Sequence, residues 1–285
     1  MTTILTTIAG VRTFPSPPPP NRRAVVMTMG ALHAGHLALV TAARDVVGPT
    51  GQVLVTVFVN PLQFGDQADL ETYPRTLAAD LEACRAAGVD AVFAPSAAEM
   101  YPNGEPQTTV VPGATADDLE GAARPGHFVG MLTVVLKLLA ISTPDVAFFG
   151  EKDYQQLTLI RQMVADLNIG VDIIGVATCR EPDGLAMSSR NVRLTAADRP
   201  AALSLSRALS AGQAAAAQGG DGAAVVSAAG AKLTDIDVDY LALRSVDLGP
   251  PPEAGPARLL VAAKVAGVRL LDNCEVVLCD KGGHA

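Results

Sequence analysis

The sequence predicts an α/β fold, with a mostly parallel sheet that has helices on both faces and a smaller α+β C-terminal domain behind it. From residue 24 onward, short apolar runs alternate with helical patterns, an order that implies right-handed crossovers between parallel strands. Beyond residue 178 the pattern changes to Ala-rich helical stretches and then to three strand-like runs. We therefore predict two domains, residues 1–178 and residues 179–285.

The first elements can be justified one by one. Residues 1–23 contain the proline-rich run 15–20, which cannot be a helix or a central strand, so this segment is predicted to be extended and to lie on the surface. The apolar run 24–27 predicts the first buried strand, and a helix is expected from Leu37. The nearly continuous β-branched run 53–59 predicts a strand that is covered on both faces.

The remaining elements follow the same reasoning. In the first domain, strands are expected at 89–93, 146–149 and 171–176, and helices at 80–87, 131–141 and 154–167. In the second domain, helices are expected at 196–217 and 222–233, and strands of a small antiparallel sheet at 238–244, 259–265 and 268–278.

Composition excludes several classes of partner. The formal charge of −8 argues against nucleic acid, because a phosphate backbone requires a basic surface. The four cysteines show no CxxC spacing, which argues against a zinc site or a disulfide framework and suits a reducing compartment. No signal-peptide order and no run of about 18 apolar residues occur, so we expect a cytoplasmic protein with no membrane partner.

The first chemical motif follows the first predicted strand. His33 and His36 stand three apart with Gly35 between them, at the start of the expected helix. In an open α/β sheet, the carboxyl end of a strand and the N-terminus of the next helix form the usual nucleotide site, and Gly30 would let a nucleotide approach the backbone. An imidazole that donates to phosphate would stabilise the charge that develops there. The alternative is two surface histidines at a helix start.

Two further loops carry groups that can bind anions. Residues 150–153, Gly-Glu-Lys-Asp, follow the strand 146–149 directly; the alternative is an ordinary solvated loop. Residues 187–191, Met-Ser-Ser-Arg-Asn, bring two hydroxyls and a guanidinium together at the predicted domain junction; the alternative is a turn or a helix cap. A loop at such a junction can close over a triphosphate.

Neutral polar groups follow the strand 53–59. Asn60 and Gln63 can hydrogen-bond a small polar substrate without adding charge. The loop 124–128, Arg-Pro-Gly-His-Phe, can add further polar groups, with a surface turn as the alternative.

Together these motifs resemble the pantothenate synthetase (pantoate–β-alanine ligase) family of the HxGH nucleotidyltransferase superfamily, over about residues 25–273. The HxGH loop is widespread, but its combination with Asn60–Phe64, with Phe148–Gln156 and with Ala186–Asn191 is specific. The resemblance implies a ligase with a Rossmann-like nucleotide- and pantoate-binding domain and a C-terminal domain that carries residues 187–190. The implied reaction condenses pantoate with β-alanine through a pantoyl adenylate and releases AMP and pyrophosphate. ATP is implied as a substrate, Mg²⁺ as its companion, and a homodimer as the assembly.

The resemblance also implies a role for individual residues. The implied catalytic residues are His36, His33, Lys152 and Arg190. The residues implied to bind ATP are Met29, Gly30, Ala31, Leu32, His33, Ala34, Gly35 and His36, then Gly150, Glu151, Lys152 and Asp153, then Cys179 through its backbone, and last Met187, Ser188, Ser189 and Arg190. Gln63, Gln156 and Asn60 are implied to bind the substrates, and Asp80 to bind a metal ion.

Two departures from the family pattern keep an alternative open. Met27 stands where members usually have proline, and residues 77–83 retain only Asp80 of an acidic cluster near magnesium. The alternative is a nucleotide-binding relative with lost or altered ligase activity, which would bind ATP without releasing pyrophosphate.

Overall fold

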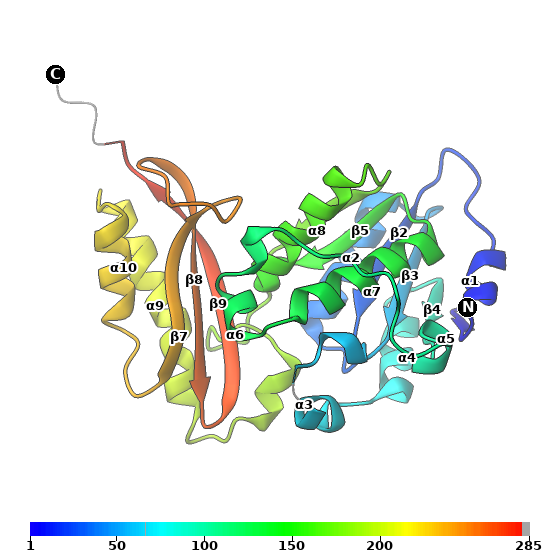
Figure 1. Cartoon of the computed structure of the whole chain (residues 1–285), viewed down its shortest axis with the longest axis horizontal. Coiled ribbons are helices and arrows are strands. Elements are labelled where there is room, and N and C mark those ends of the chain that lie inside the picture. The colour runs from blue at the N-terminus through cyan, green and yellow to red at the C-terminus, as the bar shows by residue number, and fades with distance from the viewer. Residues whose placement is uncertain (66, 281–285) are drawn as a thin grey trace. The chain divides into compact units, whose positions relative to one another are not determined.

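The structure is a computed structural model that describes residues 1–65 and 67–280 (Figure 1). It divides into two compact units. The first unit consists of Met1–Glu151 and Leu159–Ala177, and the second consists of Lys152–Thr158 and the described chain from Thr178 onward. In the described ranges, no helix combines the length and apolar character that crossing a membrane requires.

A parallel sheet forms the centre of the first unit. In its described part, six strands pair in the order β1-β4-β3-β2-β5-β6, and every pairing is parallel. The strands are β1 (Thr3–Leu5), β2 (Arg23–Thr28), β3 (Gln52–Val57), β4 (Ala91–Phe93), β5 (Val146–Gly150) and β6 (Asp172–Val176). In the centre, Val25 of β2 stands opposite Leu54 of β3 and Ala147 of β5. The predicted Rossmann-like sheet is confirmed.

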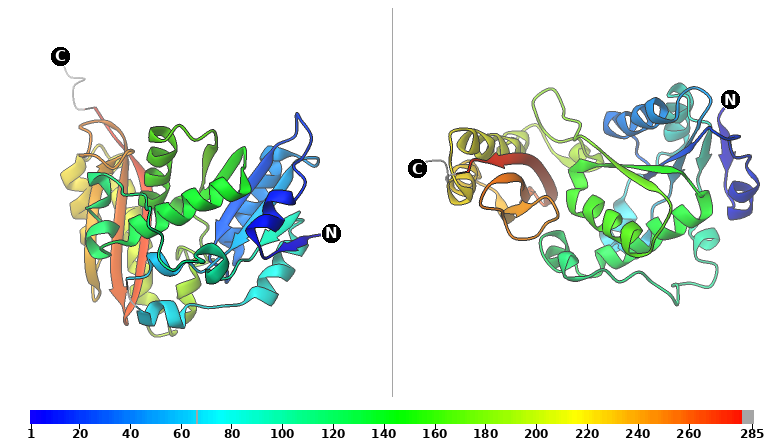
Figure 2. Two further views of the ribbon diagram at one scale, coloured as in Figure 1. Left: turned by 45° about the vertical axis from the view of Figure 1, so that its right-hand side comes forward. Right: turned by 90° about the horizontal axis from the view of Figure 1, so that it is seen from above.

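Helices cover both faces of this sheet, as Figure 2 shows from above. On one face lie α2 (Ala34–Val47) and α4 (Leu77–Ala86), and on the other lies α7 (His127–Ser142). Alternate strand residues such as Val26 and Val55 pack against Leu39 and Val40 of α2. Because both faces are covered, the central strands can be apolar at every position, which explains their continuous β-branched runs.

Short helices and turns connect these elements. They are α3 (Gln67–Thr72), α5 (Ala97–Met100) and α6 (Glu120–Ala123), with the 3-10 turns η1 (Pro61–Gln63), η2 (Ala114–Ala116), η3 (Glu151–Asp153) and η4 (Ser189–Arg193). The last helix of the sheet region is α8 (Tyr154–Asp166), which leads to β6.

The N-terminal segment differs from the prediction. Residues 1–23 are not all extended, because β1 pairs with β4 and α1 (Ile8–Thr13) follows it. Thr7 caps α1 by accepting a hydrogen bond from the Gly10 N–H (3.0 Å). A strand of three residues is too short to show a periodic pattern, and its pairing with β4 is a long-range contact that no local signal predicts.

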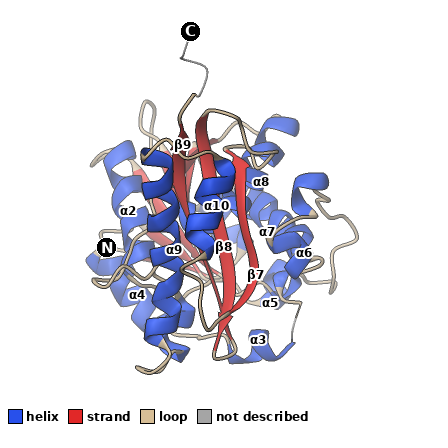
Figure 3. Cartoon of the chain, turned by 90° about the vertical axis from the view of Figure 1, so that its left-hand side faces the viewer, coloured by secondary structure: helices blue, strands red, loops and turns tan. Residues whose placement is uncertain are grey.

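The second unit combines a small antiparallel sheet with two helices (Figure 3). The sheet order is β7 (Asp237–Ser245), β8 (Gly255–Val265) and β9 (Val268–Leu278), and α9 (Arg199–Ala217) and α10 (Gly222–Gly230) cover one face. Ala202 and Ala208 of α9 are fully buried against this sheet. The alanines of this region therefore let the helices approach the strands closely.

The segment Lys152–Thr158 belongs to the second unit, whereas the predicted boundary at residue 178 assigns it to the first domain. The reason lies in its side chains. The Tyr154 hydroxyl donates to the Val246 carbonyl (3.0 Å), and its ring stacks under the Arg258 guanidinium (4.1 Å to the ring centre). Such contacts between residues distant in sequence do not show in a local pattern.

Candidate active site

The predicted loops of the first unit lie where the strand order reverses. The chain runs from β2 to its neighbour β3, while β5 lies on the opposite side of β2. Such a switch point opens a crevice at the carboxyl ends of the strands, where α/β proteins bind ligands. Residues 29–36 follow β2, residues 60–63 follow β3, and Gly150 ends β5 with Glu151 directly after it. The first unit thus brings these three loops to one edge of the sheet.

The two histidines are held by the start of α2. The N-cap residue is His33, whose Nδ1 accepts a hydrogen bond from the Gly35 N–H (3.1 Å). The His36 Nδ1 accepts from the His33 N–H (3.3 Å), which completes a capping box, and the ring centres are 4.0 Å apart. Since both Nδ1 atoms accept, each neutral ring carries its proton on Nε2. Two Nε2–H donors are therefore fixed side by side.

This arrangement differs in detail from the sequence prediction. The helix begins at Ala34 rather than Leu37, so His33 is its N-cap residue and His36 lies in its first turn. They meet because each imidazole caps the backbone of the same helix start. The spacing of a capping box, in which residues N-cap and N3 interact, is the sequence signal that could have shown this.

The turn before the histidines is held by Asp80. Gly30 and Ala31 have positive φ angles (80° and 51°), and the Asp80 carboxylate accepts hydrogen bonds from the N–H groups of Ala31 (3.1 Å) and Leu32 (2.8 Å). Both carboxylate oxygens also lie 3.2 Å from the Thr76 hydroxyl. As a metal ligand, Asp80 stays a prediction. Among the described residues, no group of three or more His, Cys, Asp or Glu side chains could hold a metal ion.

The predicted substrate amides form a buried network. Asn60 accepts from the Tyr101 hydroxyl (2.9 Å) and donates to the Gly130 carbonyl (3.2 Å) and to the Gln63 Oε1 (3.1 Å). The other end of the Gln63 amide, Nε2, lies 3.1 Å from the sulfur of Met29. The predicted substrate glutamine therefore contacts the predicted nucleotide loop within the first unit.

The loop 124–128 supports Gln63 from behind. The His127 Nδ1 lies 2.9 Å from the Gln63 carbonyl oxygen, and an Arg124 guanidinium nitrogen lies 3.4 Å from the same oxygen. Another Arg124 guanidinium nitrogen lies 3.1 Å from the His127 Nε2. Because a guanidinium only donates, the His127 Nε2 accepts, and the proton of His127 is on Nδ1. The sequence marked this loop as polar, and the structure shows that two of its side chains hold the backbone of Gln63.

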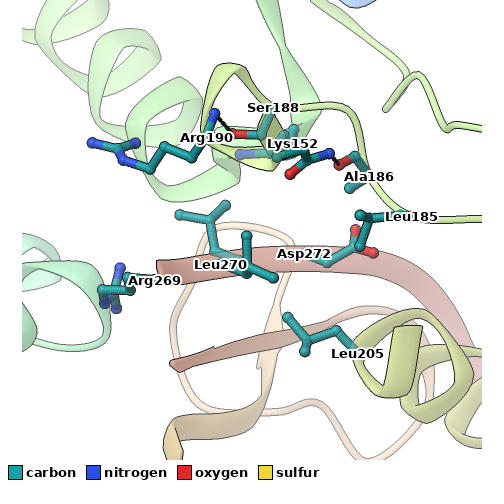
Figure 4. Close-up of a pocket in the computed structure, with 11 residues that line it drawn as sticks. Lys152, Leu185, Ala186, Ser188, Arg190, Leu205, Arg269, Leu270 and Asp272 are labelled. Carbon is teal, nitrogen blue, oxygen red and sulfur yellow. Dashed lines mark hydrogen bonds between the residues drawn. The ribbon is translucent and has the colours of Figure 1, made fainter. Parts of the chain in front are cut away.

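The second unit has a pocket of its own, lined by predicted cationic and hydroxyl groups (Figure 4). Lys152, Ser188 and Arg190 line it, together with Arg269 and Asp272. The Ser188 Oγ caps η4 by accepting a hydrogen bond from the Arg190 N–H (3.2 Å). The positively charged side chains of Lys152, Arg190 and Arg269 thus suit this pocket to an anionic ligand.

Two ion pairs partly neutralise the charged side chains around this pocket. The buried Asp272 accepts from Arg180 (2.6 Å and 3.0 Å), and this hydrogen bond raises the pKa of Arg180 above its ordinary value. Arg269 pairs with Asp239 (2.6 Å). Arg269 and Asp272 were absent from the predicted site, and their only signal was that they lie within the range of about 25–273 over which the sequence resembles the family.

The backbone of Lys152 is fixed by the strands of the second unit. The Asn273 Nδ2 donates to the Lys152 carbonyl (2.8 Å), and the Asn273 Oδ1 accepts from the Arg258 Nε (2.6 Å). Asn273 is 3% exposed and Arg258 is also buried. A side chain from β9, braced by one from β8, therefore holds the predicted catalytic lysine.

Two predicted nucleotide segments meet in the second unit. The Met187 N–H donates to the Cys179 carbonyl (2.9 Å), and Arg180 and Ala186 form an isolated antiparallel bridge. Cys179 therefore lies next to residues 187–190. Gln156 lies half-buried in the first turns of α8, also in this unit.

The predicted site residues thus form two sets. The set on the first unit is Met29–His36, Asn60, Gln63, Asp80, Gly150 and Glu151, and the set on the second unit is Lys152, Asp153, Gln156, Cys179 and Met187–Arg190.

A parallel sheet with an HxGH loop at its switch point defines a nucleotide-binding α/β protein of the HxGH class. A model of the pantoate-beta-alanine ligase family matches residues 3–275. The chain belongs to this family, and it is a ligase.

Relatives and solved structures agree with this assignment. The pantothenate synthetase of Salinispora arenicola is 59% identical over 258 residues, which cover 89% of this chain and 90% of the relative. The pantothenate synthetase of Nocardia farcinica is 60% identical over 260 residues, covering 90% of this chain and 79% of the relative.

Among solved structures, a pantothenate synthetase of Thermus thermophilus has a TM-score of 0.89 and 44% identity, covering 95% of this chain and 98% of that one. The pantoate-beta-alanine ligase of Francisella tularensis, complexed with beta-gamma ATP and beta-alanine, has a TM-score of 0.79 and 34% identity, covering 96% and 97%.

Proposed function

We propose that this chain condenses pantoate with β-alanine at the expense of ATP, through a pantoyl adenylate, and releases AMP and pyrophosphate. The observation that carries the proposal is the pair of Nε2–H donors, on His33 and His36, at the switch point of the parallel sheet. The family supports the substrates, and the Francisella tularensis relative was solved with beta-gamma ATP and beta-alanine.

In the first step, a carboxylate oxygen of pantoate attacks the α-phosphorus of ATP. A bond forms between that oxygen and phosphorus while the bond from phosphorus to the pyrophosphate oxygen breaks. Negative charge builds up on the leaving pyrophosphate, so fixed N–H donors and cations stabilise the transition state more than the ground state.

In the second step, the neutral amine of β-alanine attacks the acyl carbon of the adenylate. A carbon–nitrogen bond forms, the carbon–oxygen bond to AMP breaks, and the ammonium proton passes to solvent. A carboxylate alone would have to expel oxide, whereas the adenylate expels a stable phosphate monoester. The protein needs no covalent nucleophile, because alignment of the reactants alone is worth about 7–11 kcal/mol at best.

On the first unit, residues 29–36 bind ATP, and the Nε2–H groups of His33 and His36 donate to its phosphates. Gly150 and Glu151 complete this side of the nucleotide site. Gln63 and Asn60 bind pantoate and β-alanine. The contact between Gln63 and Met29 of the ATP-binding loop supports this role, because pantoate must meet ATP at the α-phosphate.

On the second unit, Lys152 and Arg190 supply positive charge to the phosphates, with Ser188 and Ser189 as hydroxyl donors. Their joint lining of one pocket supports the role of Lys152, Ser188 and Arg190. Asp153 completes the nucleotide loop, Met187 and the backbone of Cys179 bind adenine, and Gln156 binds pantoate.

Magnesium accompanies the ATP phosphates in this proposal. The predicted protein ligand, Asp80, already uses both carboxylate oxygens in hydrogen bonds, and the described residues offer no cluster of ligands around it. The ion would bind through substrate phosphates and water, as Mg²⁺ commonly does, and would offset the negative charge of the triphosphate. The predicted homodimer and cytoplasmic location stay predictions.

A single-turnover assay tests the proposed chemistry. The protein is mixed with ATP and pantoate in the absence of β-alanine, and pyrophosphate is expected to appear in an amount equal to the active sites. AMP is then expected only when β-alanine is added. The appearance of ADP and phosphate would refute the adenylate route. ATP binding by calorimetry without pyrophosphate release would instead favour a relative that has lost the activity.

A further inference from the structure

The turn that connects β2 to the histidines has an unfavourable backbone conformation. Gly30 has a φ of 80°, which glycine adopts freely, but Ala31 has a φ of 51°, a region that side chains with a Cβ rarely occupy. Residues in such regions persist only where surrounding contacts hold them. The contacts that hold Ala31 therefore decide whether this turn keeps its shape.

Asp80 of α4 supplies those contacts. Its Oδ2 accepts from the Ala31 N–H (3.1 Å) and its Oδ1 from the Leu32 N–H (2.8 Å), so one carboxylate binds two successive backbone groups. Successive N–H groups in a tight turn form a concave site for an anion, and here the anion is the protein's own side chain. Asp80 is 2% exposed, so a loss of these bonds would take two hydrogen bonds from a buried carboxylate, at a cost in free energy.

Thr76 and Gly30 both contribute to the match between the Asp80 carboxylate and the turn. The Thr76 hydroxyl lies 3.2 Å from each carboxylate oxygen. A Cβ on Gly30 would come within 3.0 Å of the Asp80 Oδ2 and 3.2 Å of Val57, so only glycine fits between the turn and α4 without displacement. The turn and the carboxylate are therefore matched in shape as well as in hydrogen bonding.

We propose that Asp80 is a positioning residue, which holds the Gly30–Leu32 turn in the conformation that presents His33 and His36 to ATP. It acts through the backbone: the turn leads directly into His33, whose N–H in turn donates to His36. The carboxylate is thus a fixed internal partner of the nucleotide loop rather than a ligand for magnesium. This inference rests on the proposed function, in which residues 29–36 bind ATP.

The first test is the near-isosteric variant Asp80→Asn. An amide offers one oxygen where two N–H groups need acceptors, and its NH₂ group would face the second N–H. We expect the KM for ATP to rise about tenfold to a hundredfold, with little change in the KM for β-alanine. The matched control is Asp45→Asn, which removes an exposed carboxylate from α2, and it is expected to leave both constants unchanged.

A second variant separates positioning from a general loss of stability. In Asp80→Asn combined with Ala31→Gly, glycine adopts the positive φ without a steric penalty, so most of the lost affinity for ATP is expected to return. A merely structural role would lower the melting temperature, and Ala31→Gly would not restore the KM. If Asp80→Asn does not fold, Thr76→Val removes only the hydroxyl bond, and a smaller rise in the KM for ATP is expected from it.

Two readouts distinguish the remaining outcomes. Excess Mg²⁺ that restores Asp80→Asn activity would overturn the proposal in favour of a metal ligand. Amide hydrogen exchange of residues 29–36, measured without any substrate, is expected to become faster in Asp80→Asn and not in Asp45→Asn; unchanged exchange would also overturn it. Because this readout needs no activity, it stays decisive even if the wild-type protein releases no pyrophosphate and the proposed function fails.

Discussion

At the scale of single residues, the proposed chemistry depends on which nitrogen of each histidine carries its proton. Both Nδ1 atoms accept from backbone N–H groups, so the helix start itself selects the Nε2–H form of His33 and His36. Under the proposed function, the same backbone contacts select this tautomer without ATP, so no change of tautomer is needed when charge develops on the phosphates.

His36→Ala should slow adenylate formation at least about a hundredfold, because it removes a donor aimed at developing charge. The measurement is the rate of pyrophosphate release in a single turnover with ATP and pantoate. Thr41→Ala, on the exposed side of the same helix, is the control and should turn over normally. Near-normal release by His36→Ala would remove His36 from its assigned role.

The sequence predicted these residues only in part. The spacing of His33 and His36 predicted a nucleotide loop, because such a motif consists of residues close together in the sequence. It did not predict that His33 caps the helix, nor that Asp80 binds the turn. The second contact joins residues almost fifty positions apart, and a local pattern contains no information about such a pair.

At the scale of elements, a glycine lets α7 approach the turn that carries Gln63. A Cβ on Gly130 would lie 2.1 Å from the Leu62 carbonyl oxygen and 2.8 Å from the Gln63 N, so helix and turn are in direct backbone contact. The Gly130 carbonyl also accepts from Asn60 (3.2 Å). The predicted substrate amides are therefore positioned by the surface of a helix as well as by their own loop.

Gly130→Ala should displace this turn. We expect a higher KM for pantoate and a loss of about 1–3 kcal/mol in the free energy of unfolding, the usual cost of an overpacked methyl group. Steady-state kinetics and urea unfolding measure the two effects. The control Gly170→Ala adds a methyl group in open space, and an equal effect of both variants would show that the close contact is unimportant.

The strands of the second unit support Lys152 in a comparable way. In Asn273→Ala, the Lys152 carbonyl and the Arg258 Nε lose their shared partner. We expect a loss of about 1–3 kcal/mol in the free energy of unfolding from the removal of these two hydrogen bonds, and slower release of pyrophosphate. Gln213→Ala, which removes an exposed hydrogen bond to another residue of β9, should change neither quantity.

At the scale of the whole molecule, one buried and one half-buried thiol, Cys84 and Cys274, link stability to pH. Burial raises the pKa of Cys84 to about 11 and that of Cys274 to about 12. In the unfolded chain these thiols ionise near their ordinary value of 9.0. Their contribution to stability is therefore complete below about pH 9 and is lost as the pH rises toward 11 and 12, because the unfolded state then releases protons that the folded state retains.

The free energy of unfolding should accordingly fall between about pH 9 and about pH 11. Urea unfolding at a series of pH values measures it. Cys84→Ala lowers stability at every pH through the lost packing, but it should flatten the alkaline decline. An equally steep decline in that variant would show that other groups cause it.

The overall architecture was the most predictable part of the molecule. Continuous apolar runs such as 53–59 and alternation with helices predict a covered parallel sheet, because burial on both faces dictates composition along the whole strand. The division of the chain was less predictable. Residues 152–158 join the second unit through Tyr154 and Asn273, whose partners lie 92 and 121 positions away.

The two units are consequently interleaved along the gene. The chain passes from one to the other after Glu151, after Thr158 and after Ala177, so the codons for neither unit are contiguous. A recombinant that took its C-terminal region from a relative would inherit Asn273 from one parent and Lys152–Thr158 from the other. Chimaeras within the family should therefore succeed more often when that short inner segment and the C-terminal region share one ancestor.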